Sequence, residues 1–166
     1  QVSINALIAF GMTFVILTGG IDLSVGSILA LTSAVMANAI ASGMSPEVSM
    51  VLAAVLGIGL GLVNGVIIAY GRLVPFIATL ATMTIYRGAT LVFTDGNPIS
   101  GFESDAFFRA IGQGYLVGIP VPAIVMLITF VILYLVLGKT PLGRHTYAVG
   151  GNEKVSFISG IKINKV

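Results

Sequence analysis

The first residues able to do chemistry lie in a short polar break between two apolar runs. Residues 19–26 hold the carboxylate of Asp22, the hydroxyl of Ser24 and glycines at positions 19, 20 and 26. One interpretation is a helix break in which Asp22 or Ser24 caps a helix that starts near Val25. Another is a discontinuous helix whose free backbone groups and carboxylate line a water-filled path. Both can hold at once.

Uncharged polar side chains also recur within the apolar runs, at Asn38, Asn64, Thr79, Thr82 and Thr84. Each alone is typical of a structural role, because threonine often bonds its own helix backbone. As a set, with Asp22 and Arg87 as the formal charges, they favour a neutral polyhydroxylated solute over an ion. The predicted pathway residues are Asp22, Ser24, Asn38, Asn64, Thr79, Thr82 and Arg87.

Three glycines share one helical face, since Gly57, Gly61 and Gly65 are spaced four apart. Glycine at that spacing lets another backbone approach closely, so tight helix packing is the first interpretation. The alternative is a channel wall, which requires the neighbouring Asn64 to face the lumen.

The C-terminal segment contains signals for a short capped helix. Asn152 is a good N-cap, Glu153 suits the first turn and Gly160 suits the residue after the last turn, so we expect a helix of about seven residues. A helix that short is marginal alone in water. Its apolar residues Val155, Phe157 and Ile158 could fill a groove on a partner, or the helix could fold back on its own chain.

The composition places these groups in a membrane. Of 166 residues, 8 are Lys or Arg and 6 are Asp or Glu, the apolar share is 57% and the mean hydropathy is +1.08. That excludes a soluble domain, a disordered chain, a coiled coil and a nucleic-acid binder. His145 is the single histidine and cysteine is absent, so we predict no metal site, no cofactor, no catalytic residue and no enzyme.

Apolar stretches long enough to cross a bilayer predict an all-α polytopic protein. The expected spans cover residues 4–19, 24–43, 48–71, 74–94 and 119–138. The fourth span contains Arg87, which costs about 2.5 to 3.5 kcal/mol at midspan and should face protein or water. The chain starts without Met at the edge of an apolar stretch, so we interpret it as a fragment of a longer protein.

The basic residues predict the orientation. Arg72, Lys139, Arg144, Lys154, Lys162 and Lys165 fall on one side and Arg109 on the other, so the first side is cytoplasmic. Residues 95–118 then form an external loop, either a docking surface for an external partner or a plain linker. Residues 139–166 form a cytoplasmic segment.

Three motifs in order resemble the permease subunits of ATP-binding-cassette sugar importers of the ribose type, within the branched-chain and monosaccharide permease family. They are the segments at residues 11–26, 75–82 and 142–161. The resemblance covers essentially the whole chain. It implies a multispanning subunit of the bacterial cytoplasmic membrane, contacting lipid and pairing as a dimer. It also implies an extracytoplasmic sugar-binding protein, cytoplasmic ATPase subunits and full permeases roughly twice this long.

The resemblance also implies residue roles. Asp22 and Ser24 match the Asp-Leu-Ser motif at the helix break, and Val155 and Ser156 depart from the small alanines common in relatives. The residues matching the segment that couples to the ATPase are Gly143, Arg144, Gly150, Gly151, Asn152, Glu153 and Gly160. Ribose is the expected sugar, among a set that includes xylose and galactosides.

Two other functions remain compatible with the residues. In a secondary transporter, Asp22 and Arg87 would serve as an intramembrane proton or ion relay. A passive scaffold would need no pathway at all.

Overall fold

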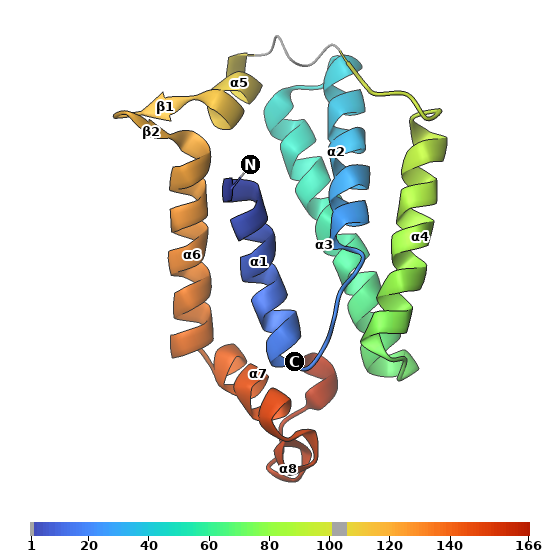
Figure 1. The fold of residues 1–166 in the computed structure, drawn as a ribbon, viewed down its shortest axis with the longest axis vertical. Coiled ribbons are helices and arrows are strands. Elements are labelled where there is room, and N and C mark those ends of the chain that lie inside the picture. Colours follow the sequence, from blue (N-terminus) through green and yellow to red (C-terminus); the bar gives the residue numbers. More distant parts are fainter. Residues whose placement is uncertain (1, 101–105) are drawn as a thin grey trace. The chain divides into compact units, whose positions relative to one another are not determined.

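A computed structural model describes residues 2–100 and 106–166, and the described part is almost entirely helical (Figure 1). A two-stranded hairpin, β1 (Tyr115–Leu116) and β2 (Ile119–Pro120), is the exception. The helices are α1 (Val2–Leu17), α2 (Val25–Ala41), α3 (Pro46–Gly71), α4 (Pro75–Phe93), α5 (Ala106–Gln113), α6 (Val121–Lys139), α7 (Pro141–Gly151) and α8 (Glu153–Ile158), followed by a 3₁₀ turn, η1 (Ile163–Lys165).

The ends of the helices follow from local chemistry. Pro46, Pro75 and Pro141 occupy first positions of helices, where a missing N–H costs nothing. At the other end of α1, Gly19 takes a φ of +79° and its N–H bonds Ile16 O, while Gly20 N–H bonds Val15 O. This left-handed cap ends the helix after 16 residues.

The described residues have polar groups inside and apolar groups outside. Their buried polar residues are Ser24, Ser27, Thr32, Ser49, Asn64, Thr79, Thr82, Thr146 and Ser156, whereas the buried hydrophobic residues are Ala37, Ala78 and Tyr86. Such a distribution is unstable in water and is suited to a lipid solvent. Helices α3, α4 and α6 are long and apolar enough to cross a bilayer, and α1 and α2 are apolar but shorter.

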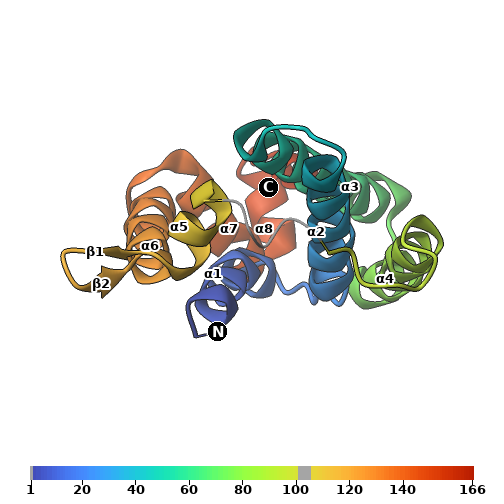
Figure 2. The same cartoon turned by 90° about the horizontal axis from the view of Figure 1, so that it is seen from above.

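Residues 23–114 form one compact unit. In it, α2 packs against both α3 and α4, and α3 makes a smaller contact with α4 (Figure 2). Gly57 of α3 faces Thr32 of α2, whose methyl group would lie 3.6 Å from a Cβ added at the glycine. The central position of α2 brings the residues that precede it next to the other two helices.

Residues 1–22 and 115–166 form the second unit. Helix α1 lies beside α6, with the rings of Phe10 and Phe130 5.4 Å apart. Helix α7 follows α6 and packs against both α6 and α1 (Figure 1). A Cβ added at Gly143 would collide with the backbone carbonyl of Leu137, and one added at Gly150 with the carbonyl of Leu17.

Several elements differ from the sequence-based expectation. Residues 141–151 form an α-helix that hydropathy does not predict, with Pro141 at its first turn and the Thr140 hydroxyl accepting from Gly143 N–H. The predicted loop over 95–118 contains α5 and the first hairpin strand, β1, whereas β2 occupies the first two residues of the span predicted over 119–138. Residues 101–105 lie outside the described part. Helices α5 and α7 and the hairpin strands are short, so none of them produces the long apolar run by which a span is identified.

The close approach at Gly150 yields a prediction for stability. Replacing Gly150 by Ala should destabilise the protein by about 1 to 3 kcal/mol, because the added methyl group meets a backbone carbonyl that side-chain rotation cannot move. Gly151→Ala is the matched control, since a Cβ there meets nothing within 4 Å. Heat unfolding of the full-length protein in detergent, followed by circular dichroism, measures both. Equal midpoints for the two variants would contradict the predicted contact.

Candidate functional site

The polar break between α1 and α2 is held by side chains of α3 and α4. Leu23 N–H donates to Thr79 Oγ1 at 3.2 Å, and Thr79 Oγ1 itself donates to Pro75 O at 2.8 Å. A hydroxyl carries one proton and two lone pairs, so Thr79 can serve both partners. Thr79 is 1% exposed, and in apolar surroundings a backbone N–H freed by a helix break needs such an acceptor.

Ser24 makes the second attachment, to α3. Asn64 Nδ2 donates to Ser24 Oγ at 2.7 Å, and both residues are buried. The hydroxyl of Tyr86 on α4 lies 3.4 Å from Asn64 Oδ1 and 3.3 Å from Leu60 O, and can donate to either. We call Ser24, Asn64, Thr79 and Tyr86 the polar cluster. It joins the start of α2 to α3 and α4 through side-chain hydrogen bonds.

Helix α2 begins at Val25 with Ser24, one of the two predicted capping residues, at its N-cap position, but the Ser24 side chain does not cap it. Ser24 is the N-cap residue, but its side chain makes no capping hydrogen bond and its backbone is helical, with φ −80° and ψ −13°. Its hydroxyl is instead used by Asn64. The polar partner available on α3 competes with the local cap, and only the tertiary fold reveals that partner.

The predicted pathway residues do not all meet. Ser24, Asn64 and Thr79 belong to the polar cluster, and Thr82 is buried on the same helix as Thr79, with its hydroxyl bonded to Thr79 O. Asn38 and Arg87 are exposed, and Asp22 is half-buried. The buried members of the predicted set are therefore distinct from the members that are exposed or half-buried.

Tyr86 is the member of the cluster that sequence reasoning missed. It is 6% exposed and is one of the few large side chains buried among the described residues. The signal that could have found it is spacing, because Thr79, Thr82 and Tyr86 follow at three- and four-residue intervals and lie on one helical face.

The glycine face of α3 is used only in part within the described residues. A Cβ at Gly57 would lie 3.6 Å from the methyl group of Thr32 on α2, an ordinary side-chain contact, and a Cβ at Gly61 or Gly65 would meet nothing within 4 Å. Within the described residues no other element approaches Gly61 or Gly65, so close packing at these two positions stays a prediction. Asn64 is buried in the polar cluster, which also removes the observation that the channel-wall alternative required.

The short helix of the tail is capped at both ends as predicted. Asn152 Oδ1 accepts from Val155 N–H at 3.0 Å, and the helix runs six residues from Glu153 to Ile158. Gly160 takes a φ of +85°, Gly160 N–H bonds Phe157 O, and Ile161 N–H bonds Ser156 O. These paired hydrogen bonds form a Schellman motif, which satisfies carbonyls at the end of α8.

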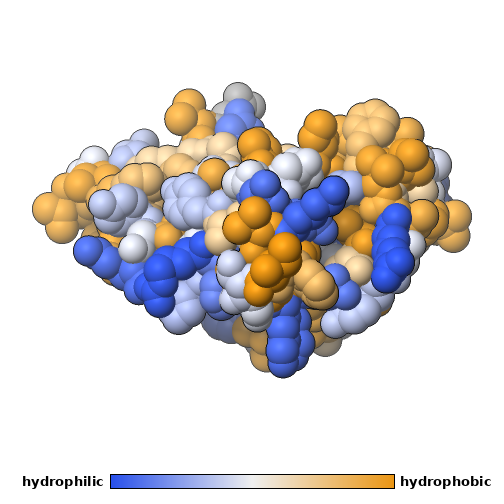
Figure 3. Space-filling view, turned by 90° about the horizontal axis from the view of Figure 1, so that it is seen from below, coloured by the Kyte–Doolittle hydropathy of each residue, from blue (hydrophilic) through white to orange (hydrophobic). Residues whose placement is uncertain are grey.

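Helix α8 presents apolar side chains to the outside of its unit. Phe157 is 70% exposed and Ile158 is 83% exposed. In the view from below, where α8 lies nearest the viewer, a hydrophobic cluster borders strongly hydrophilic groups (Figure 3). Exposed apolar side chains on a short helix that is capped at both ends, with hydrophilic groups beside them, are suited to a groove on another protein.

The predicted coupling residues divide into two kinds. Gly143 and Gly150 lie against the last-turn carbonyls of α6 and α1, so they govern how α7 packs. Asn152 and Gly160 are the caps of α8. Arg144, Gly151 and Glu153 are exposed and remain available for contact.

The structure therefore combines apolar helices that have a polar interior with a helix break hydrogen-bonded to α3 and α4, and with a capped helix after the last long apolar helix.

Comparison with known proteins gives the class of protein to which these features belong. Residues 1–166 match the family model described as the permease component of branched-chain amino acid transport systems, and the chain belongs to that family. The chain is thus part of an all-α, multi-pass protein of the bacterial inner membrane: its composition predicted the helical membrane class, and the resemblance to the permease family implied the bacterial membrane. The family is one of transport proteins rather than of enzymes.

Among curated relatives, the chain is similar to ribose import permeases. It is 61% identical over 166 residues to the one from Bacillus subtilis and 52% identical over 170 residues to the one from Haemophilus influenzae, covering 100% of this chain and 52% of each relative. It is 44% identical to the D-allose transport permease of Escherichia coli, over 98% of this chain and 50% of that relative. The chain spans about half the length of these relatives. No solved structure matches.

The polar cluster generates a second prediction. Asn64→Leu should destabilise the protein by about 1 to 3 kcal/mol, because Ser24 and Tyr86 lose a buried partner, whereas Tyr86→Phe should cost about 1 kcal/mol. Thr84→Val is the control, since Thr84 is exposed and bonds only its own helix at Leu80 O. Heat unfolding in detergent ranks the variants. A Thr84 variant as unstable as the Asn64 variant would contradict the assignment.

Proposed function

We propose that the protein is the permease subunit of an ATP-binding-cassette importer that carries a monosaccharide, ribose, across the cytoplasmic membrane. The observation that carries the proposal is the 61% identity to a ribose import permease along all 166 residues. Identity is lower with the permeases for other sugars, at 44% for the D-allose protein and 36% for a fructose import permease of Bifidobacterium longum. Ribose is therefore the best-supported sugar.

The proposed partners follow the same reasoning. Two permease subunits form the pathway, a sugar-binding protein delivers substrate from outside, and ATPase subunits bind the cytoplasmic segment 139–166. Helix α8 is the docking element, because Phe157 and Ile158 are exposed on a helix whose two ends are capped. A preformed apolar element binds with less loss of conformational entropy than a flexible one.

The contacts suggest how movement of α8 reaches the pathway. Helices α8 and α7 are adjacent, and Gly150 of α7 abuts Leu17, the last residue of α1. Leu17 is followed directly by the polar break, and the break is tied to α4 through Leu23 and Thr79. A displacement of α7 would therefore act on the break. Closely packed backbones have low compressibility, so they transmit such displacements.

The pathway residues can be assigned in two groups on this proposal. Ser24, Asn64, Thr79 and Thr82 position the break through their internal hydrogen bonds. Asp22, Asn38 and Arg87 are the candidates for contact with the solute, because their side chains are half-buried or exposed. Hydroxyl groups of a sugar can use both carboxylate acceptors and guanidinium or amide donors.

Capping of α8 provides the test of coupling. Asn152→Ala should reduce ATP-driven ribose uptake by the full-length protein several-fold, because losing an N-cap costs about 0.5 to 2 kcal/mol and α8 has six residues. Asn152→Asp keeps a capping oxygen and should retain uptake. The measurement is ribose accumulation, with co-purification of the ATPase subunit as a second readout. Full activity in the alanine variant would remove α8 from the coupling mechanism.

Energy supply separates the importer from a secondary transporter. An importer of this class should continue uptake when a protonophore collapses the proton gradient while ATP is maintained. If Asp22 and Arg87 formed a proton relay, the protonophore would stop uptake at once. Asp22→Asn would then abolish the uptake that the proton gradient drives. A passive scaffold would show no uptake change on deletion.

Orientation has its own test. The basic residues predict that Lys154 and Lys162 face the cytoplasm, so an amine reagent that does not cross membranes should label neither in intact cells. Both should react in inverted vesicles. Labelling of either lysine from outside intact cells would show that the predicted orientation is inverted. Helix α8 would then lie outside the cell, where a cytoplasmic ATPase cannot bind it.

A further inference from the structure

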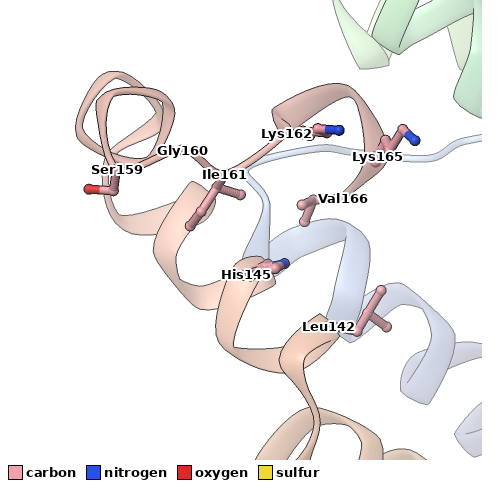
Figure 4. Close-up of a pocket in the computed structure, with 8 residues that line it drawn as sticks. All are labelled: Leu142, His145, Ser159, Gly160, Ile161, Lys162, Lys165 and Val166. Carbon is pink, nitrogen blue, oxygen red and sulfur yellow. The ribbon is translucent and has the colours of Figure 1, made fainter.

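The hairpin that precedes α6 carries no charged side chain. Residues 115–120, which form β1, the turn and β2, read Tyr-Leu-Val-Gly-Ile-Pro. The chain beyond the other end of α6 has a different composition, since His145, Lys162 and Lys165 lie among aliphatic side chains around the pocket beside α7 (Figure 4). The lack of charge is therefore a property of the hairpin itself and is not shared by both ends of the span.

The turn of the hairpin places a valine where a turn in water favours a polar residue. Leu116 pairs with Ile119, so Val117 and Gly118 form a two-residue turn, and their φ angles are both positive, at 51° and 78°. Such turns favour Asn-Gly or Asp-Gly, because a β-branched residue is strained at positive φ. Val117 is also 94% exposed within its unit. A strained apolar side chain at the tip indicates apolar surroundings outside the hairpin.

Both faces of the hairpin are apolar. Side chains directly opposite each other in a strand pair share a face, so Leu116 and Ile119 lie on one face and Tyr115 and Pro120 on the other. A hairpin on a protein surface buries one face and leaves a polar face in water. The phenol hydroxyl of Tyr115 is the single polar side-chain group in residues 115–120. This pattern fits an apolar medium on both faces better than a groove on a protein.

Helix α6 fixes the level of the hairpin relative to the membrane. Strand β2 ends at Pro120, and α6, which is long and apolar enough to cross a bilayer, begins at Val121. The hairpin therefore lies where the span leaves the hydrocarbon core. It extends sideways from the end of α6, on the side away from α1 (Figures 1 and 2). That direction runs along the membrane surface rather than out into water.

We propose that the hairpin is a membrane-surface anchor that inserts into the lipid boundary between headgroups and acyl chains. Leu116, Val117 and Ile119 enter the acyl region, and the Tyr115 ring lies at the headgroup level. A two-stranded hairpin is marginally stable alone in water, so lipid contact would hold both the hairpin and the start of α6. The proposal requires neither sugar nor an ATPase, and its failure would leave the proposed function untouched.

The test measures the depth of residue 117 in a bilayer. A nitroxide spin label is attached to Val117→Cys in the full-length protein, with any other cysteine replaced by serine, in nanodiscs of phosphatidylcholine and phosphatidylglycerol. Spin relaxation is measured with oxygen, which concentrates in lipid, and with a nickel chelate, which stays in water. The ratio of oxygen to nickel collisions at residue 117 should be several-fold higher than at a water-exposed position. Leu116→Cys is a second labelling site and should give the same result.

Ser45→Cys is the matched control. Ser45 is exposed in the turn between α2 and α3, and its side chain makes no capping hydrogen bond. The charged Glu47 follows it closely in the chain, so we expect the label at residue 45 to contact water. Equal collision ratios at residues 45 and 117 would overturn the proposal.

Val117→Asn separates lipid contact from the stability of the turn. Asparagine suits a turn with two positive φ angles better than valine does, but its amide disfavours insertion into lipid. With the label at residue 116, Val117→Asn should therefore lower the collision ratio. An unchanged or higher ratio would show that the valine does not hold the hairpin in lipid.

Two further results identify a different occupant. Low collision rates with both reagents at residue 117 would show that protein covers the tip of the hairpin, and the lipid proposal would be wrong. If the label is accessible to nickel and becomes immobile when a purified external sugar-binding protein is added, the hairpin docks that protein and does not contact lipid.

Discussion

The rest of the structure depends on how the backbone break before α2 is satisfied without water. Residues between α1 and α2 leave helical hydrogen bonding inside an apolar environment, where an unpaired N–H or C=O costs several kcal/mol. Thr79 accepts from Leu23 N–H and Asn64 donates to Ser24, so α4 and α3 each supply one partner. The break and the packing of α2 against these helices therefore stabilise each other.

The second constraint is steric and lies in the other unit. Gly143 and Gly150 place the backbone of α7 directly against carbonyls at the ends of α6 and α1. Larger residues could not occupy these positions without moving a backbone. The result is a stiff connection between the capped helix α8 and the residues that precede the break. On the proposed function, such a connection would pass a displacement of α8 to the residues that precede the break.

The tail presents its apolar side chains on a short helix that is capped at both ends. Phe157 and Ile158 of α8 are exposed, while Asn152 and Gly160 fix the two ends of the helix. Such a surface suits a groove on a folded protein.

The sequence by itself determined the helical class, the membrane environment and the two caps of α8. Hydropathy, proline and glycine positions and an N-cap residue act through neighbours a few residues away, so their consequences can be predicted locally. Only the tertiary structure decided that the Ser24 hydroxyl serves Asn64 rather than capping α2, and that Tyr86 completes the cluster. It likewise decided that Gly61 and Gly65 meet no other part of the described chain, while Gly150 meets α1. These outcomes depend on residues 22 to 133 positions apart, and no local pattern encodes which distant group arrives at a given face.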